Sequence, residues 1–256
     1  MINDVPSPVD HRIVARAEWI EARKALLAKE KEETHLRDRI NAERLALPWV
    51  KIDADYVFDT PTGRKSLDNL FDGRSQLIVY HFMLPPSWEA GCPGCSFLVD
   101  HIDGALPHLN NHDVTLVAVS RAPMDKIAAY KKRMGWHFPW VSSNGSSFNY
   151  DFNVSFSAEQ VAKGDVDYNF RKSPVPADAA PTEQELPGLS SFYKNDAGEI
   201  FHTYSSYARG PEELIGTLMI LDRAPLGRNE AVTMNWVRRH DEYETKPEAK
   251  ACHSAE

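Results

Sequence analysis

The chain has 256 residues, of which 42% are hydrophobic and 26% charged, and its formal net charge is −8. This composition suits one large α/β domain with appendages, and the negative charge argues against a nucleic-acid partner, because a phosphate backbone is bound by a cationic face. No run of about 18 apolar residues is present, so no membrane partner is expected. The first residues lack the basic and apolar segments of a secretory signal, and three cysteines make no disulfide framework; we therefore expect a cytoplasmic protein.

Residues 1–50 are predicted to form a helical arm. Ser7, Pro8 and Asp10 are typical of a helix start, with serine at the cap and proline at the first helical position. No proline or glycine follows until about Leu47. Apolar residues recur at roughly helical spacing, at Ile13, Ala17, Ile20, Leu27, Leu36 and Ile40. Such an arm packs on a partner or wraps its own domain; it suits a homodimer without establishing one.

Strands and helices alternate after the arm. The turn residues Pro61, Thr62 and Gly63 predict a hairpin within residues 56–67. Apolar runs and helical patterns then predict a helical turn at 67–71, a buried strand at 77–82, a helix at 93–109 bent near Gly104 and Pro107, a buried strand at 114–119 and a helix at 123–134. This order predicts two parallel strands joined by a right-handed crossover.

The second half of the chain is less regular. Residues 157–187 contain few large apolar side chains and several prolines, which predicts an insertion or mobile loop in a domain that spans 51–245. A hairpin is expected at 189–204, a last helix from Pro211 to Leu221, and a disordered tail at 246–256.

Four aromatic residues in the middle of the chain have the spacing of side chains on one face of a strand, namely Phe148, Tyr150, Phe152 and Phe156. This spacing predicts core or edge packing. An aromatic wall of a substrate site is the alternative.

The most informative motif is Cys92-Pro93-Gly94-Cys95, which lies between an apolar strand and a predicted helix. Proline is tolerated in a first helical turn, so Cys92 is predicted to cap the helix, and Cys95 falls on the same face one turn later. One turn holds the two Cα atoms within the span of about 4.4–6.8 Å that a disulfide needs. The positive end of the helix dipole favours a Cys92 thiolate. The motif thus predicts either thiol redox chemistry or metal binding.

The order of elements resembles the thioredoxin-like fold in its peroxiredoxin-like branch, an α/β fold of three layers with a mixed central sheet. Several segments between Val9 and Tyr243 resemble one bacterial family more closely. These segments are Tyr80-His81-Phe82-Met83, the cysteine motif with Ser96-Phe97, Val117 to Pro123, Met134-Gly135-Trp136, Phe138 to Ser143, Asn149 to Phe152, Phe201 to Tyr204 and Trp236 to Asp241. The family is domain-of-unknown-function family 899, described as predicted dithiol–disulfide oxidoreductases. The resemblance implies that Cys92 and Cys95 are catalytic.

The chain departs from a standard thioredoxin around the cysteines. The central dipeptide is Pro-Gly instead of Gly-Pro, and Trp88 lies four residues before Cys92 instead of next to it. Because the dipeptide affects the redox poise, the sequence does not distinguish a reductant from an oxidant. Thioredoxin-like proteins carry a cis-proline that faces the dithiol, and Pro187 is our candidate, with an ordinary loop proline as the alternative. We assign Trp88, Pro187 and Arg121 as candidate substrate-binding residues.

Thiol–disulfide exchange is the main functional hypothesis, with Cys92 as the attacking thiolate and Cys95 as the resolving thiol. The expected partner is a protein or small-molecule thiol or disulfide. No cofactor is expected, because the chain has no dinucleotide fingerprint. The enzymatic alternative is a thiol peroxidase, in which a sulfenic acid on Cys92 condenses with Cys95. Arg121 or Arg209, together with Ser87, would then polarise the peroxide.

Two non-enzymatic alternatives stay open, a structural metal site and a redox-like scaffold that only binds. Zinc needs four ligands, of which the cysteine pair supplies two. Nearby histidines are candidates for the rest, although surface or capping roles explain them more simply: His81, His101, His108 and His112. Near the C-terminus, Arg238, Arg239 and His240 are interpreted as a solvated helix end, with an interface or anion contact as the alternative.

Overall fold

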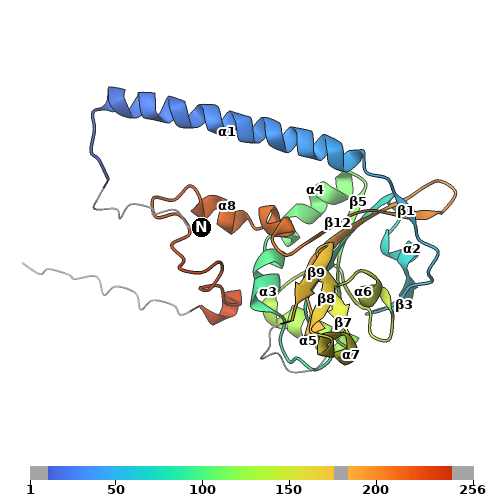
Figure 1. Cartoon of the computed structure of the whole chain (residues 1–256). Helices are drawn as coiled ribbons and strands as arrows, with labels where there is room; N and C mark the ends of the chain where they lie inside the picture. The colour runs from blue at the N-terminus through green and yellow to red at the C-terminus, as the bar shows by residue number, and fades with distance from the viewer. Residues whose placement is uncertain (1–10, 176–183, 244–256) are drawn as a thin grey trace, which may run out of the picture.

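A computed structural model of the chain describes residues 11–175 and 184–243. Its centre is a mixed sheet of eight strands in the order β1-β12-β11-β4-β5-β6-β2-β3 (Figure 1). The parallel centre consists of β4 (Gln76–His81), β5 (Val114–Ser120) and β6 (Trp140–Ser142). The remaining strands pair antiparallel: β11 (Gly188–Lys194), β12 (Ile200–Tyr207) and β1 (Val50–Lys51) on one side, and the hairpin of β2 (Val57–Thr60) and β3 (Gly63–Ser66) on the other.

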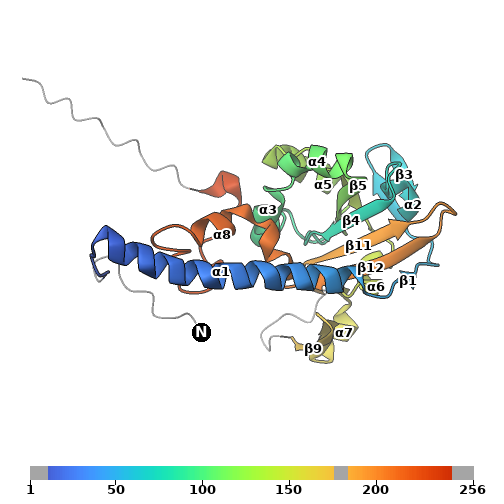
Figure 2. The same cartoon turned by 90° about the horizontal axis from the view of Figure 1, so that it is seen from above.

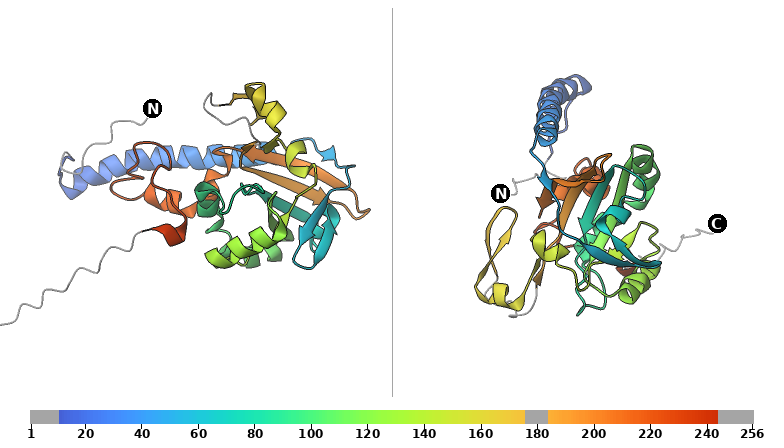
Figure 3. Two further views of the ribbon diagram at one scale, coloured as in Figure 1. Left: turned by 90° about the horizontal axis from the view of Figure 1, so that it is seen from below. Right: turned by 90° about the vertical axis from the view of Figure 1, so that its right-hand side faces the viewer.

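Successive residues of β4 and β5 point to opposite faces of the sheet and bury two separate cores. Tyr80 and Ala118 belong to one core, which is covered by α3 (Pro93–Val99), α4 (Leu106–Asn111), α5 (Met124–Met134) and α8 (Gly216–Leu221). Val79 and Val119 belong to the other, which is covered by α2 (Leu67–Leu70), α6 (Phe148–Asp151), α7 (Ala158–Ala162) and the hairpin of β8 (Asp165–Tyr168) and β9 (Arg171–Pro174). The end-on view in Figure 3 shows these layers. They confirm the predicted three-layer thioredoxin-like fold.

Short helical pieces complete the chain. The helix predicted over 93–109 is interrupted: α3 ends at Val99, and the 3-10 turn η2 (Asp103–Ala105) precedes α4. The interruption expected near Gly104 is thus present, whereas Pro107 lies in the first turn of α4 and breaks nothing. The predicted last helix is a 3-10 turn, η3 (Gly210–Leu214), followed by α8, and a further turn η4 (His240–Glu242) lies near the C-terminus. Among the described residues, no helix is long and apolar enough to cross a membrane.

The N-terminal arm is a helix, α1 (Arg16–Leu45), that extends away from the sheet (Figures 1 and 2). The prediction of one continuous helix from Ser7 is wrong, because residues 11–15 are not helical; Ser7, Pro8 and Asp10 themselves lie outside the described residues. Helix ends fray first, and this end has neither a side-chain cap at Ala15 nor any burial of Ile13, which is fully exposed. No residue of α1 is buried. Wrapping of its own domain is therefore excluded for α1, whereas packing on a partner and the 1–50/51–245 boundary stay predictions.

Two predictions for the middle of the chain are partly wrong. The predicted core packing of the aromatic residues is confirmed for Phe148, Phe152 and Phe156, which are buried in the core that contains Val79. Their strand-like alternation is wrong, because Phe148 and Phe152 lie one turn apart at α6, where their rings meet at 4.8 Å. Of the four aromatics only Phe156 is in a strand, β7 (Ser155–Phe156), which pairs with β10 (Gln184–Glu185). The described part of the segment 157–187 is not a mobile loop but forms α7 and the β8–β9 hairpin, because a capping box starts α7 and side chains of both enter the core. That this segment is an insertion stays a prediction. Residues 176–183 and the tail 246–256 lie outside the described residues.

A chain of polar side chains is buried between β4, β11 and β12. Nε2 of His81 lies 2.9 Å from Oγ of Ser190, which lies 2.8 Å from Oγ of Ser205; the latter lies 2.8 Å from Nε2 of His202. His81 also stacks on the ring of Phe148 at 5.5 Å. Burial, with a smaller effect from His202, lowers the pKa of His81 from 6.5 to about 3. His81 is therefore neutral in the folded protein.

We predict that His81 makes the protein less stable in mild acid. The unfolded chain takes up a proton at His81 near pH 6.5, whereas the folded protein does not until about pH 3. Stability is therefore lost as the pH falls below 6.5, by up to about 1.4 kcal/mol per pH unit for one proton. Urea unfolding between pH 7.5 and 5 should show a smaller loss for His81→Phe than for the wild type. An identical loss in both proteins would contradict the prediction.

Candidate functional site

Cys92 is held at the point where the chain turns from β4 into α3. The loop after β4 returns to the strand, so that the backbone N–H of Cys92 donates to the carbonyl of Met83 at 3.1 Å. Cys92 is the N-cap of α3 and Pro93 its first residue, which confirms the predicted cap. The sulfur therefore lies at the N-terminal end of the helix, where backbone N–H groups are free to donate to it.

Gly91 is fixed by close packing immediately before Cys92. A Cβ atom at this position would lie 2.5 Å from the ring of Phe82 and 2.7 Å from the ring of Tyr130. Only glycine fits such an approach. The carbonyl of Gly91 accepts two hydrogen bonds from the guanidinium of Arg239, at 2.9 and 2.7 Å. The backbone on both sides of the Cys92 nitrogen is thus constrained.

The Cys92 sulfur is surrounded by hydrogen-bond donors. The thiol of Cys95 donates to it and is the largest cause of its lowered pKa. The backbone N–H groups of Cys95 and Gly94 and the positive charge of Arg239 act in the same direction, whereas burial opposes them. The net effect lowers the pKa of Cys92 from 9.0 to about 6. Cys92 is therefore mostly a thiolate at neutral pH, as a nucleophilic cysteine must be.

Cys95 has the opposite character. It is 2% exposed, and burial followed by the neighbouring Cys92 raises its pKa well above the ordinary value. Two donors reduce this effect, namely the hydroxyl of Tyr80 and the backbone N–H of Met83. Tyr80 lies on β4 and is itself 2% exposed. The pair therefore combines an activated thiolate with a protected thiol, which is the asymmetry that attack and resolution require.

The three predicted substrate-binding residues lie in different surroundings. Trp88 is 39% exposed on the loop before Cys92. Arg121 is buried; it lies 3.7 Å from Glu185 and stacks on Tyr150 at 4.6 Å. Of these residues, Trp88 is nearest to Cys92 along the chain, whereas the observed contacts of Arg121 are with α6 and β10.

Pro187 is not a cis-proline, because the described residues contain no cis peptide bond. The residue lies directly before β11, whose first residue Gly188 pairs with His81 at the end of β4. Its carbonyl accepts a hydrogen bond of 2.7 Å from the Tyr168 hydroxyl. A trans-proline suits this position, since the N–H that proline lacks is not needed before a strand begins.

The residues proposed for the alternative functions are engaged elsewhere. Arg209 pairs with Glu212 in η3, and Ser87 lies exposed on the loop before Cys92. His101 is held by the carbonyl of Phe97 and the hydroxyl of Thr217, both at 2.8 Å. Within residues 11–175 and 184–243, no group of three or more His, Cys, Asp or Glu side chains is placed to hold a metal ion.

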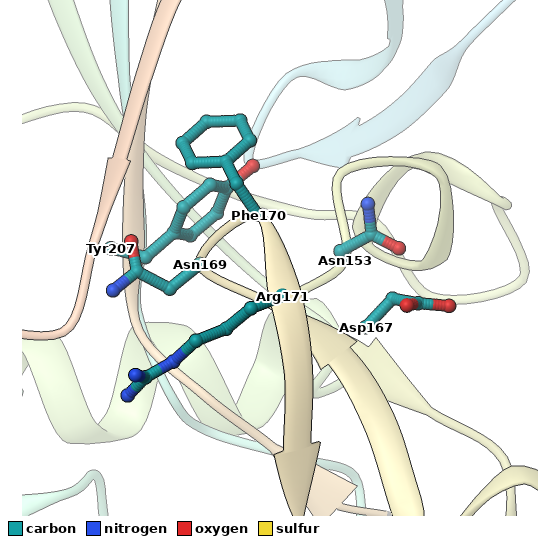
Figure 4. A pocket seen from close by; sticks show the side chains of 6 residues that line it. All are labelled: Asn153, Asp167, Asn169, Phe170, Arg171 and Tyr207. Carbon is teal, nitrogen blue, oxygen red and sulfur yellow. The ribbon is translucent and has the colours of Figure 1, made fainter.

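A small cavity of about 140 Å³ lies at the turn between β8 and β9, as Figure 4 shows. Both turn residues, Asn169 and Phe170, have positive φ angles, and Phe170 is 82% exposed. The cavity is lined by Asn153, Asp167, Asn169, Phe170, Arg171 and Tyr207. None of these residues belongs to the cysteine pair or its hydrogen-bond donors, so the cavity is separate from the dithiol site.

Sequence reasoning missed Tyr80 and Arg239. The alternation along β4 carried a usable signal for Tyr80, because a residue two positions before Phe82 must face the same side of the sheet as Phe82. Arg239 was expected at a solvated helix end. It is instead 148 residues away from the Gly91 carbonyl that it binds, a contact that no local pattern predicts.

The fold and this cysteine pair define a thioredoxin-like protein with its two cysteines at the start of the helix after the first central strand. The chain belongs to the family described as bacterial protein of unknown function (DUF899), whose model matches residues 8–243. This match confirms the resemblance noted in the sequence.

Solved structures give distant likenesses. Peroxiredoxin Q from Xanthomonas campestris is 13% identical with a TM-score of 0.42 and covers 67% of this chain and 96% of its own. A cysteine-to-serine mutant of PrxQ from Xylella fastidiosa is 14% identical with a TM-score of 0.43 (67% and 94%). Peroxidoxin BcpB from Mycobacterium tuberculosis is 14% identical with a TM-score of 0.42 (68% and 97%). A comparison with curated proteins gives no match.

The contrast between the two thiols predicts selective alkylation. Iodoacetamide reacts with thiolates, so at pH 7 it should modify Cys92 rapidly and leave Cys95 unmodified in the folded protein. The rate at Cys92 should fall to half its plateau near pH 6, because the pKa of this thiol is lowered to about 6. Mass spectrometry of the peptide that contains Cys92 and Cys95 measures the modified site and the rate at each pH. Urea-unfolded protein, in which both thiols are accessible, is the control. A half-point near 9 would contradict the prediction.

Proposed function

We propose that the protein is a thiol–disulfide oxidoreductase that uses the Cys92–Cys95 dithiol. The observation that carries the proposal is the opposite setting of the two sulfurs, with a lowered pKa at Cys92 and a raised pKa at the buried Cys95. The partner is a protein or small-molecule disulfide or thiol. A cytoplasmic location and a homodimer are part of the same proposal.

The reaction proceeds in two exchanges. The Cys92 thiolate attacks one sulfur of a substrate disulfide; a bond forms to Cys92, the substrate S–S bond breaks, and the leaving sulfur takes up a proton. Cys95 then loses its proton and attacks the Cys92 sulfur, which releases the second substrate thiol and leaves a Cys92–Cys95 disulfide. Two electrons pass from the dithiol to the substrate. A protein or small-molecule thiol restores the dithiol by the same exchanges in reverse.

The donors around each sulfur match these steps. The Cys95 thiol and the helix N–H groups stabilise Cys92 as the attacking thiolate and, when the exchanges run in reverse, as the thiolate that leaves. The Tyr80 hydroxyl and the Met83 N–H stabilise Cys95 when it loses its proton. Because the burial of Cys95 disfavours its thiolate, these two donors act at the step where stabilisation is most needed.

Substitution of each cysteine tests the proposal. Cys92→Ser should abolish reduction of a disulfide such as oxidised glutathione or an insulin disulfide. Cys95→Ser should accumulate a mixed disulfide at Cys92, because the attack that resolves it is lost. Mass spectrometry detects the trapped adduct, and Cys252→Ser serves as the matched control with wild-type behaviour. Unchanged thiol exchange in both Cys92→Ser and Cys95→Ser would exclude the mechanism.

Tyr80→Phe should slow the second exchange and leave the first unchanged. The substitution removes only the hydroxyl that donates to Cys95, and a hydrogen bond to a charged group is worth about 1.5–3 kcal/mol, so we expect at least about a tenfold slower decay of the mixed disulfide. Rapid-quench trapping measures both steps. Tyr56→Phe is the control, since it also removes one tyrosine hydroxyl, which donates to Asp151 at 2.9 Å. Tyr56 belongs to the core on the other face of the sheet, away from the cysteines. Equal decay rates in the two variants would count against a role for Tyr80.

A peroxidase assay distinguishes thiol–disulfide exchange from the alternative, thiol peroxidase activity. Thiol peroxidase chemistry requires that hydrogen peroxide oxidise Cys92 to a sulfenic acid before Cys95 condenses with it. If the protein consumes hydrogen peroxide rapidly with a thiol reductant but exchanges slowly with disulfides, the peroxidase alternative replaces exchange.

A further inference from the structure

The segment before the C-terminus, residues 230–243, packs against the start of α3. Trp236 meets Phe97 of α3 edge to face at 5.5 Å, and Val237 is buried in the core that contains Cys95. A Cβ atom on Gly94 would lie 3.5 Å from the terminal methyl of Met234 and 3.8 Å from the Cys92 sulfur. Met234 is therefore a neighbour of the dithiol, although 139 or more positions separate the two along the chain.

Several polar contacts fasten this segment to the domain. Nδ1 of His240 lies 2.7 Å from Asp100, which also accepts a hydrogen bond from Trp136 at 2.7 Å. Arg133 of α5 pairs with Asp241 at 2.7 Å and with Glu242 at 3.0 Å. These contacts link the segment to the C-terminal end of α3 and to α5, so the position of Arg239 is determined by the fold.

Arg239 is the residue of this segment that reaches the dithiol. Its Nε and Nη2 atoms donate to the Gly91 carbonyl, and its side chain also interacts with the Tyr130 hydroxyl. Tyr130 in turn lies 2.8 Å from Oγ of Ser96, which donates to the Cys92 carbonyl at 2.8 Å. Arg239 thus holds the backbone of Cys92 directly through residue 91 and indirectly through residues 130 and 96.

We propose that Arg239 is a positioning residue of the dithiol site: it fixes the Gly91–Cys92 peptide and places its positive charge beside the Cys92 sulfur. The role deepens the proposed exchange function and rests on it, because the charge assists the thiolate that attacks and later leaves. Through Arg239, the segment 230–243 contributes to the dithiol site.

The other ionisable groups around Cys92 and Arg239 are accounted for. Cys95 and Tyr80 lie on the α3 and β4 sides, and Tyr130 and Arg133 on α5. Glu242 pairs with Arg239 at 2.8 Å, but it also pairs with Arg133. The carboxylate is therefore shared between two arginines and neutralises neither completely.

The test compares Arg239→Gln with Arg238→Gln. Arg238 is the adjacent arginine, but its guanidinium donates to the carbonyls of Asn235 and Val237 within its own segment. Alkylation of Cys92 by iodoacetamide is measured from pH 5 to 9 by mass spectrometry. Arg239→Gln should shift the profile to higher pH and slow the reaction at pH 6 by about fivefold, the effect of a pKa raised by about one. Arg238→Gln should follow the wild type, and Arg239→Lys, which keeps the charge without the paired donors, should lie between.

A profile of Arg239→Gln that superimposes on the wild type would overturn the inference, and so would an equal shift in Arg238→Gln. If Arg239→Gln shows no cooperative thermal unfolding, Glu242→Gln replaces it. This variant removes the carboxylate that competes for Arg239, so its profile should shift to lower pH; no shift would overturn the inference. The alkylation experiment needs no disulfide substrate and therefore tests the role of Arg239 alone. If the wild-type protein exchanges no disulfides, the proposed function is refuted, but the effect of Arg239 on Cys92 can still be measured.

Discussion

The hydrogen bond from the Cys95 thiol to the Cys92 sulfur is the interaction on which the site depends. Two identical side chains in one helical turn would titrate alike in water. Here a single proton is shared unequally, because burial keeps it on Cys95 and the donors at the helix start favour the charge on Cys92. The two sulfurs therefore behave as one coupled unit with distinct roles. The fold maintains the difference by burying Cys95 in the core beneath α3 while Cys92 remains at its end.

One strand connects this site to the rest of the molecule. Tyr80 on β4 faces α3 and the cysteines, whereas its neighbour His81 faces the opposite core and the polar chain to His202. The two residues differ in what their surroundings require. Tyr80 donates a hydrogen bond to Cys95, whereas the buried His81 must remain neutral. A one-residue shift in the register of β4 would exchange them and bury each in the wrong core. The pairing of β4 with both β5 and β11 is thus a condition of the proposed thiol chemistry as well as of stability.

Sequence patterns predicted the elements that are determined by local periodicity. The buried strands, the cysteine cap and the interrupted helix after it follow from apolar runs, proline and glycine, and all three are present. The errors arose where distant contacts decide. Phe148 and Phe152 have a spacing that fits a strand or one helical turn, and packing on His81 and Phe192 selects the turn. Pro187 has the expected place before a central strand but not the cis bond, which no residue pattern specifies.

Arg239 is likewise placed by contacts with residues far away in the sequence. An arginine pair near a chain end is usually solvated, and the residues that make this one different are Gly91, Tyr130 and Glu242, which lie on three separate parts of the chain. Gly91 is the informative partner. Its lack of a side chain allows the rings of Phe82 and Tyr130 to approach the backbone, while its carbonyl accepts from Arg239. Gly91 thus serves the site in two ways, through the space it leaves for these rings and through the carbonyl that accepts from Arg239. The surroundings of the dithiol therefore come from the central strand β4 and from the segment 230–243 together.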